Sequence, residues 1–195
     1  MLVHSDRVSR FFVAAAMLAS ITASVIYNWK TFGGEASPNI TSWFLWATIT
    51  VLNFTSYRSM SGDWLKSTLP TSNSLFCVLT FFVALFFGKI YAPNAYDIAV
   101  LTLGSAAAFV WWRFRSSKKA NLLVQAALCI AFTPTFFTVV ADPSTEIALS
   151  WFLWAAAFLI QAIVVILRWK KEWAELAYPV GGVLLHFAVG ILALR

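Results

Sequence analysis

The hexapeptide Ser-Trp-Phe-Leu-Trp-Ala occurs twice in the chain, at Ser42–Ala47 and at Ser150–Ala155. The two copies lie 108 residues apart, and six consecutive identities that include two tryptophans are improbable even in a biased composition. With one inserted residue the match continues, so that Pro70 faces Pro179. Such a repeat indicates one structural unit that is used twice in the same chain.

The composition excludes most classes of soluble protein. Of 195 residues, 61% are hydrophobic and 11% are charged, whereas a soluble domain has about 45–50% apolar and about 25% charged residues. The chain has too little polar surface for a water-soluble globule, so we expect no secreted disulfide scaffold, no nucleic-acid-binding module and no cytosolic enzyme. Cys77 and Cys129 both lie in apolar stretches and are interpreted as buried hydrophobic residues.

Seven apolar stretches are predicted to cross a lipid bilayer, since a transmembrane helix needs about 20 mostly apolar residues. They are residues 11–27, 42–57, 69–88, 95–112, 121–140, 148–168 and 176–194. The repeat makes the first three equivalent to the last three, and the span between them gives both units the same orientation. We therefore expect an all-α polytopic membrane protein with a three-helix repeat over 11–88, a linker helix over 95–113 and a second three-helix repeat over 119–195.

Basic residues predict the orientation, because lysine and arginine gather on the cytoplasmic side of membrane proteins. Eleven lie on the side of the N-terminus: Arg7, Arg10, Arg58, Lys66, Arg113, Arg115, Lys118, Lys119, Arg168, Lys170 and Lys171. The other side carries three: Lys30, Lys89 and Arg195. The distribution predicts a cytoplasmic N-terminus and an external C-terminus in a bacterial inner membrane.

Tryptophan positions agree with these spans, since indole rings favour the membrane–water interface. Eight of the ten lie close to predicted span ends: Trp29, Trp43, Trp64, Trp111, Trp112, Trp151, Trp169 and Trp173. Trp46 and Trp154 lie one turn deeper.

Several short motifs follow one another in the second repeat. The run Phe132-Thr133-Pro134-Thr135-Phe136 lies within a span, Ser150 opens the next span, and Tyr178-Pro179 opens the last. This order resembles the repeat of the PQ-loop, SWEET and SemiSWEET membrane proteins, and is similar to that of uncharacterised bacterial seven-helix proteins. The first repeat departs from the pattern: at the offset of the hexapeptide, Ile26 stands opposite Pro134, and Thr135 replaces the usual glutamine.

The resemblance implies a transporter that works by alternating access, with a sugar-like molecule as the family-level solute. It implies a hinge at Pro134 and Thr135, although prolines in membrane helices are often static. Asn73, three residues after Pro70, resembles the asparagine that follows the proline in SWEET repeats.

Two symmetric pairs are the main candidates for solute binding. Asn53 and Gln161 lie mid-span, 108 residues apart, and carboxamides both donate and accept hydrogen bonds. If the two units meet around an axis, these side chains converge on a solute; the alternative is hydrogen bonding between helices. Trp46 and Trp154, seven residues earlier, would form a stacking platform for a sugar or a heterocycle, or simply pack against neighbouring helices.

His186 is a further candidate because it lies between Gly182 and Gly190 on one helix face. The glycines allow a neighbouring helix to approach closely. His186 would then contact a solute or relay a proton, or be a packing residue whose hydrogen bonds are satisfied.

Other activities are disfavoured. No acidic pair lies mid-span, which favours facilitated diffusion over ion coupling, and Asp142 and Glu146 are interpreted as helix caps. The sequence carries no metal-ligand cluster, no phosphate-binding loop and no catalytic motif, so we expect no cofactor and no enzyme. The leading hypothesis is a transporter of a small neutral or weakly polar solute; the alternative is a receptor, a sensor or an assembly partner. A homo-oligomer is compatible with both.

Overall fold

The computed structural model describes residues 2–36, 38–88, 92 and 94–195, and their side chains from residue 6 onward. These residues form helices and no β-strand, which confirms the predicted all-α class. The elements are α1 (Leu2–Phe32), α2 (Ile40–Ser61), α3 (Trp64–Phe87), α4 (Ala95–Phe114), α5 (Ser117–Ala131), α6 (Thr133–Ala141), the 3-10 turn η1 (Pro143–Thr145), α7 (Ala148–Leu167) and α8 (Ala174–Leu192). Lys89, which was counted in the predicted orientation, lies outside the described residues.

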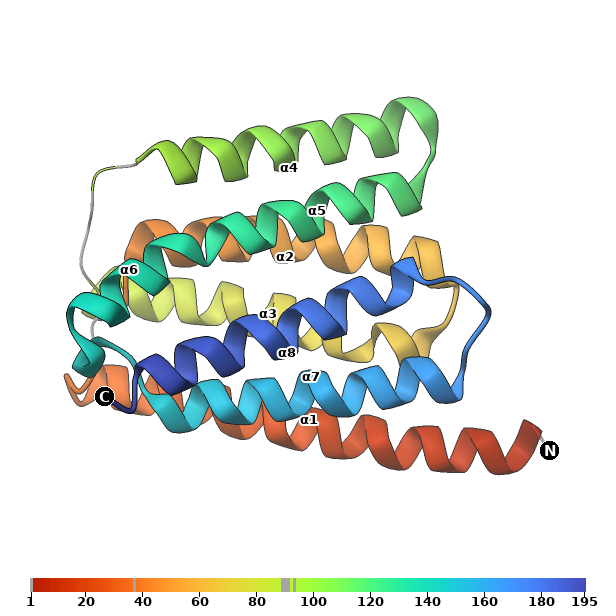
Figure 1. Cartoon of the computed structure of the whole chain (residues 1–195), viewed down its shortest axis with the longest axis horizontal. Helices are drawn as coiled ribbons and strands as arrows, with labels where there is room; N and C mark the ends of the chain where they lie inside the picture. The colour runs from red at the N-terminus through yellow and green to blue at the C-terminus, as the bar shows by residue number, and fades with distance from the viewer. Residues whose placement is uncertain (1, 37, 89–91, 93) are drawn as a thin grey trace.

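The long helices are those of a polytopic membrane protein, as predicted. Within the described residues, six stretches are long and apolar enough to cross a membrane: Asp6–Phe32, Trp64–Phe87, Ala95–Phe114, Ser117–Ala141, Ala148–Leu167 and Ala174–Leu192. The second predicted span, now α2, is missing from this set because Asn53 and several serines and threonines dilute its apolar residues. It nevertheless runs alongside the other helices in Figure 1.

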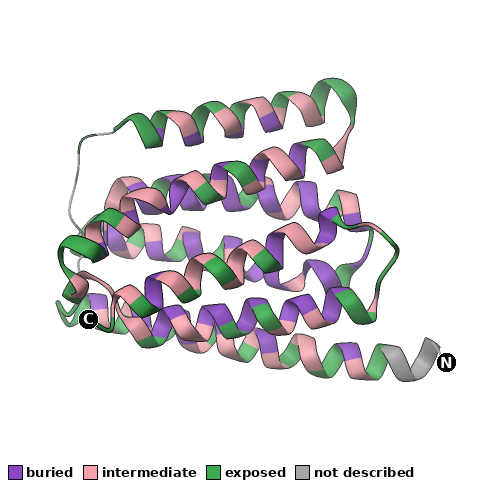
Figure 2. Cartoon of the chain, in the orientation of Figure 1, coloured by how far each residue is buried: buried purple, intermediate pink, exposed green. Residues whose placement is uncertain are grey.

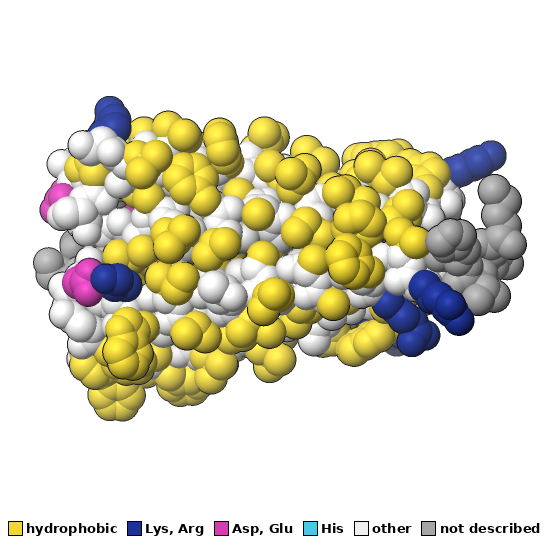
Figure 3. Space-filling model, turned by 90° about the horizontal axis from the view of Figure 1, so that it is seen from below, with side chains coloured by type: hydrophobic (Ala, Val, Ile, Leu, Met, Phe, Trp, Pro, Cys, Tyr) yellow, Lys and Arg dark blue, Asp and Glu magenta, His cyan; other side chains and the backbone are white. Residues whose placement is uncertain are grey.

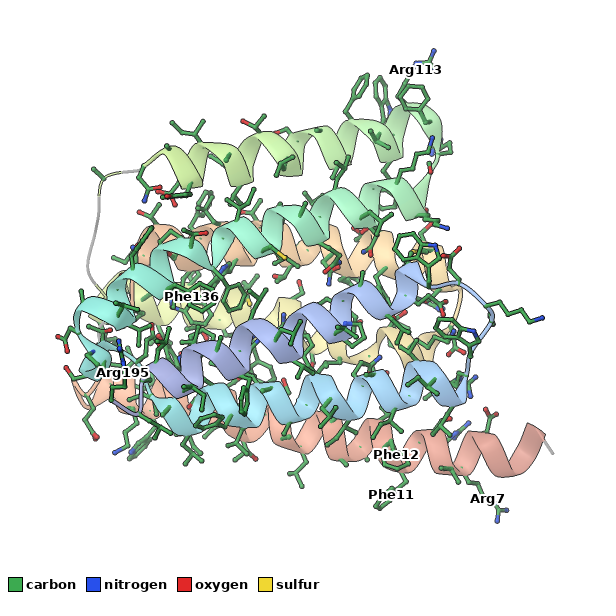
Figure 4. The ribbon with its side chains drawn as sticks, viewed as in Figure 1. Arg7, Phe11, Phe12, Arg113, Phe136 and Arg195 are labelled. Atoms are coloured by element: carbon green, nitrogen blue, oxygen red, sulfur yellow. The ribbon has the colours of Figure 1, made fainter. Side chains whose placement is uncertain are left out.

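The outer surface agrees with a lipid environment. Figure 2 shows buried residues where helices face one another and exposed residues on their outer sides. In Figure 3, apolar side chains cover the middle of the face seen from below, and Lys and Arg side chains lie towards its ends. Phe11, for example, is 70% exposed and points away from the bundle (Figure 4).

The helices pack in two similar groups (Figure 1). Helix α3 packs against both α1 and α2, and α8 packs against both α7 and the α5–α6 pair. The groups meet along two further contacts, α1 with α7 and α2 with α5. Helix α4 lies at the edge of the bundle, against α5 and α2.

One predicted span is interrupted. The stretch 121–140 is divided into α5 and α6, which meet at Phe132. Pro134 explains this break, because proline has no backbone N–H and its ring crowds the preceding turn. The corresponding helix of the first repeat, α1, contains no proline and continues over 31 residues. The two repeats therefore differ where the sequence predicted that one proline is missing.

Candidate functional site

A cavity lies inside the bundle, lined by α2, α3, α5, α7 and α8 and by Ser24 of α1. The empty space between its walls, mouth included, is about 710 Å³. Aromatic side chains form most of the wall. The polar residues that line it are Ser24, Thr50, Asn73, Thr80, Gln125 and His186. A mostly apolar cavity with a few polar groups is the usual form of a small-molecule site.

Four tryptophans from the two copies of the hexapeptide form one wall of the cavity. The ring centroids of Trp43 and Trp46 lie 4.9 Å apart, and those of Trp151 and Trp154 lie 5.2 Å apart, both edge to face. Trp46 and Trp151 join the two pairs at 6.0 Å. These four side chains are called the tryptophan cluster below.

Two further aromatic residues complete the tryptophan cluster symmetrically. The Tyr27 ring lies 5.4 Å from Trp43 and 5.5 Å from Trp154. The Phe132 ring lies 5.2 Å from Trp46 and 5.9 Å from Trp151. Each thus bridges one tryptophan from each hexapeptide, in equivalent positions.

His186 reaches the tryptophan cluster from α8. Its ring lies 5.0 Å from Phe132, 4.7 Å from Phe158 and 5.3 Å from Trp151. Its Nδ1 atom lies 2.7 Å from the backbone oxygen of Gly182. Gly182 has no side chain because the Phe158 ring occupies that space, with its nearest atom 2.2 Å from where a Cβ would stand. His186 is thus held by its ring contacts and faces the cavity.

A buried ion pair lies beside the opposite end of the cavity. Lys66 Nζ contacts Glu175 Oε2 at 2.5 Å, and the two side chains are 0% and 2% exposed. The Tyr57 hydroxyl donates to the Glu175 backbone oxygen at 2.9 Å. The Tyr57 ring packs 5.7 Å from that of Tyr178, which lines the cavity. Lys66 and Glu175 lie 109 residues apart, the same offset as Pro70 and Pro179, so the pair joins equivalent positions of the repeats.

Glu146 faces the other end, beyond the tryptophan cluster. Its Oε2 atom accepts a hydrogen bond from the Trp151 indole nitrogen at 2.8 Å. Burial raises the pKa of Glu146 to about 7, against the opposing influence of the Trp151 N–H and the Tyr27 hydroxyl. The sequence interpretation of Glu146 as a cap of α7 was wrong: Ile147 occupies the N-cap, and no side chain caps that helix end. Its position just before the second hexapeptide was the available signal.

Of the predicted binding residues, Trp46, Trp154, Asn73 and His186 line the cavity and therefore lie together. Pro134 and Thr135 lie instead in a smaller hollow that also contains Glu146 and Trp46. Whether Pro134 acts as a hinge stays a prediction; the structure shows the break in the helix. Gln125 also lines the cavity, and sequence reasoning missed it because nothing in the first repeat matches it.

The expected convergence of Asn53 and Gln161 does not occur. Asn53 Oδ1 accepts hydrogen bonds from Asn121, at 3.1 Å, and from Gln125, at 2.7 Å, both on α5. Gln161 Nε2 donates to the backbone oxygen of Lys66, on α3, at 2.5 Å. Neither residue lines the cavity. The physical reason is that each carboxamide lies at an interface between helices, where a partner satisfies it, as in the alternative interpretation.

Two tryptophans expected at the membrane interface are buried instead. Trp43 is 5% and Trp151 is 1% exposed, since both belong to the tryptophan cluster. Their place near span ends is also the place where the two repeats meet. Within the described residues no group of three or more His, Cys, Asp or Glu side chains is arranged to hold a metal ion.

The chain was compared with known proteins at three levels. No protein-family model, no curated protein and no solved structure matches it.

Proposed function

We propose that this protein is a membrane carrier of a small neutral or weakly polar solute, which it binds in the cavity through a flat ring or sugar face. The observation that carries the proposal is the composition of the cavity wall: each hexapeptide contributes two tryptophans to it. Indole faces bind sugars and heterocycles by stacking, and nearby amides such as Asn73 orient them. A site made equally by two repeats is the usual position for a solute in repeat transporters.

The proposal includes a 3+1+3 arrangement of the helices. Helices α1 to α3 form one repeat, α5 to α8 form the other, and α4 links them. In support, α3 and α8 have equivalent neighbours, and the α1–α7 contact corresponds to the α2–α5 contact. This is the parallel-repeat plan of SWEET transporters, in which the two bundles rock about the site between them.

The two ends of the cavity supply what such a rocking motion needs. At one end, Trp46 of one repeat contacts Trp151 of the other. At the other end, Lys66 of one repeat pairs with Glu175 of the other. Both contacts cross between the repeats, so rocking opens one while it closes the other. The ion pair carries no net charge, and we propose facilitated diffusion without ion coupling.

We further propose a bacterial inner membrane location with the N-terminus in the cytoplasm. Eleven of the fourteen basic residues then face the cytoplasm. Arg7 and Arg113 lie at one end of the bundle and Arg195 lies at the other (Figure 4). The ion pair is then the cytoplasmic gate, and the tryptophan cluster is the external one.

The test is a thermal-shift screen of the purified protein against sugars, nucleosides, vitamins and amino acids, followed by counterflow uptake of each hit in proteoliposomes. A ligand at a hundred times its Kd stabilises the folded state by about 2.7 kcal/mol. Gly181→Leu is the cavity-filling variant, since Gly181 lines the cavity and a Cβ there has no atom within 4 Å. Asn53→Ala is the control, because Asn53 lies outside the cavity.

A hit that is transported, that Gly181→Leu abolishes and that Asn53→Ala retains supports the carrier. A hit that binds at the same site without being transported would replace the carrier with a receptor or sensor. A panel without any hit or uptake would contradict the proposal.

A further inference from the structure

The two halves of the tryptophan cluster differ in one hydrogen bond. The Trp154 indole N–H donates to Ser24 Oγ at 3.3 Å. Ser24 in turn donates to the Ser20 backbone oxygen at 2.9 Å, which fixes its hydroxyl as an acceptor for the indole. Ser24 precedes the bridging residue Tyr27 by three positions, about one helical turn.

Trp46 is the equivalent of Trp154 in the first hexapeptide, but its indole N–H has no partner among the described residues. The residue that corresponds to Ser24 is Cys129, which precedes Phe132 by three positions. Ser24 and Cys129 both line the cavity. A thiol is a weak hydrogen-bond acceptor, so the exchange of hydroxyl for thiol leaves the Trp46 donor unsatisfied.

The unsatisfied group is well placed to meet a ligand. Trp46 is 6% exposed, and it lines the cavity. A buried donor without an acceptor is costly and is rarely left so without a reason. Other donors in the cavity are already used: Gln125 Nε2 donates to Asn53, and Thr50 Oγ1 donates to the backbone oxygen of Trp46 at 2.6 Å.

We infer that the Trp46 indole N–H is the specificity-determining donor of this site, and that the solute is a neutral ring with a hydrogen-bond acceptor on its edge. The inference rests on the proposed function and specifies the class of its solute. An acceptor such as a ring nitrogen or a carbonyl oxygen would take in the solute complex the place that Ser24 takes beside Trp154. A ring of equal size without the acceptor would leave the buried donor unpaired and would bind more weakly.

Two probes separate the acceptor from the ring. Indole and benzimidazole have the same shape and both donate an N–H, but only benzimidazole has a ring nitrogen that accepts. Calorimetric titration of the purified protein in detergent should give a Kd for benzimidazole at least tenfold lower than that for indole. Trp46→Phe keeps an aromatic ring and removes the N–H, so it should abolish this preference. Trp154→Phe is the matched control and should retain it, because the Trp154 donor is already bound to Ser24.

A second variant tests the same donor from its other side. Cys129→Ser introduces the hydroxyl that the first half lacks, so it should reduce the preference for benzimidazole and raise the melting temperature without ligand. Cys77→Ser makes the same exchange elsewhere on the cavity wall and should leave the preference unchanged.

Equal affinities for the two probes in the natural protein, or a preference that survives Trp46→Phe, would overturn the inference alone if other panel solutes bind. If no probe and no panel solute binds, the proposed function fails and the inference fails with it.

Discussion

Tyr27 and Phe132 hold equivalent positions on opposite sides of the tryptophan cluster, each within 6 Å of one tryptophan from each hexapeptide. The two residues lie 105 positions apart, so the spacing to the hexapeptide is three residues shorter after Tyr27 than after Phe132. The contacts therefore place Trp29, rather than Ile26, opposite Pro134. The offset of the hexapeptide does not extend into the first helix of each repeat, which is why the first sequence comparison missed this pairing.

Adjacent glycines of α8 should respond differently to substitution. Gly181→Leu fills open space in the cavity, so we expect a folded protein that has lost solute binding and transport. In Gly182→Ala the new methyl group would stand 2.2 Å from the Phe158 ring, which is confined by Tyr178 and His186. Overpacking of this kind costs about 1–3 kcal/mol. Melting temperatures and ligand titrations of both variants check the prediction, and an unstable Gly181→Leu would contradict it.

The ion pair between equivalent positions should tolerate an exchange of its charges. Lys66→Met alone or Glu175→Met alone leaves one buried charge unpaired, which costs about 3–5 kcal/mol. The double variant Lys66→Glu with Glu175→Lys restores the pair, because the two side chains meet between the repeats. Melting temperatures of the three variants in detergent measure this. A double variant no more stable than either single variant would show that the two positions are not equivalent.

Glu146 should make stability depend on pH. Its pKa in the folded protein is about 7, compared with an ordinary value of 4.5, so the folded state holds a proton that the unfolded state has lost between these values. Stability should therefore fall as pH rises from about 4.5 to 7. Glu146→Gln should flatten the curve of melting temperature against pH, whereas Glu35→Gln, at an exposed glutamate, should leave it unchanged. Parallel curves for the natural protein and Glu146→Gln would refute the prediction.

Asn53 should contribute to stability and not to binding. Asn53→Ala removes the acceptor of Asn121 and Gln125, and hydrogen bonds between membrane helices contribute about 1 kcal/mol each. The melting temperature should therefore fall, while the Kd for any solute excluded by Gly181→Leu should stay the same. A large loss of affinity would return Asn53 to the site.

The sequence was sufficient for the class of fold because hydropathy is a property of each segment. It could not give the partners of polar side chains, which depend on how helices pack. Asn53 and Gln161 share a repeat position, yet one bonds to α5 and the other to α3. Glu146 was misread for the same reason, since its distance from Trp151 depends on the turn between α6 and α7. The tryptophans were predicted for the site from their symmetry, and there symmetry was sufficient for Trp46 and Trp154.

The most direct test of the central claim is the accessibility of the cavity from each side of the membrane. Gly181→Cys, with Cys77 and Cys129 both changed to alanine, places one thiol in the cavity. A membrane-impermeant maleimide is then added to either face of sealed vesicles of known orientation. Alternating access predicts labelling from both faces, slowed on each by a bound solute. Labelling from one face alone, with or without solute, would contradict the carrier and indicate a fixed binding site.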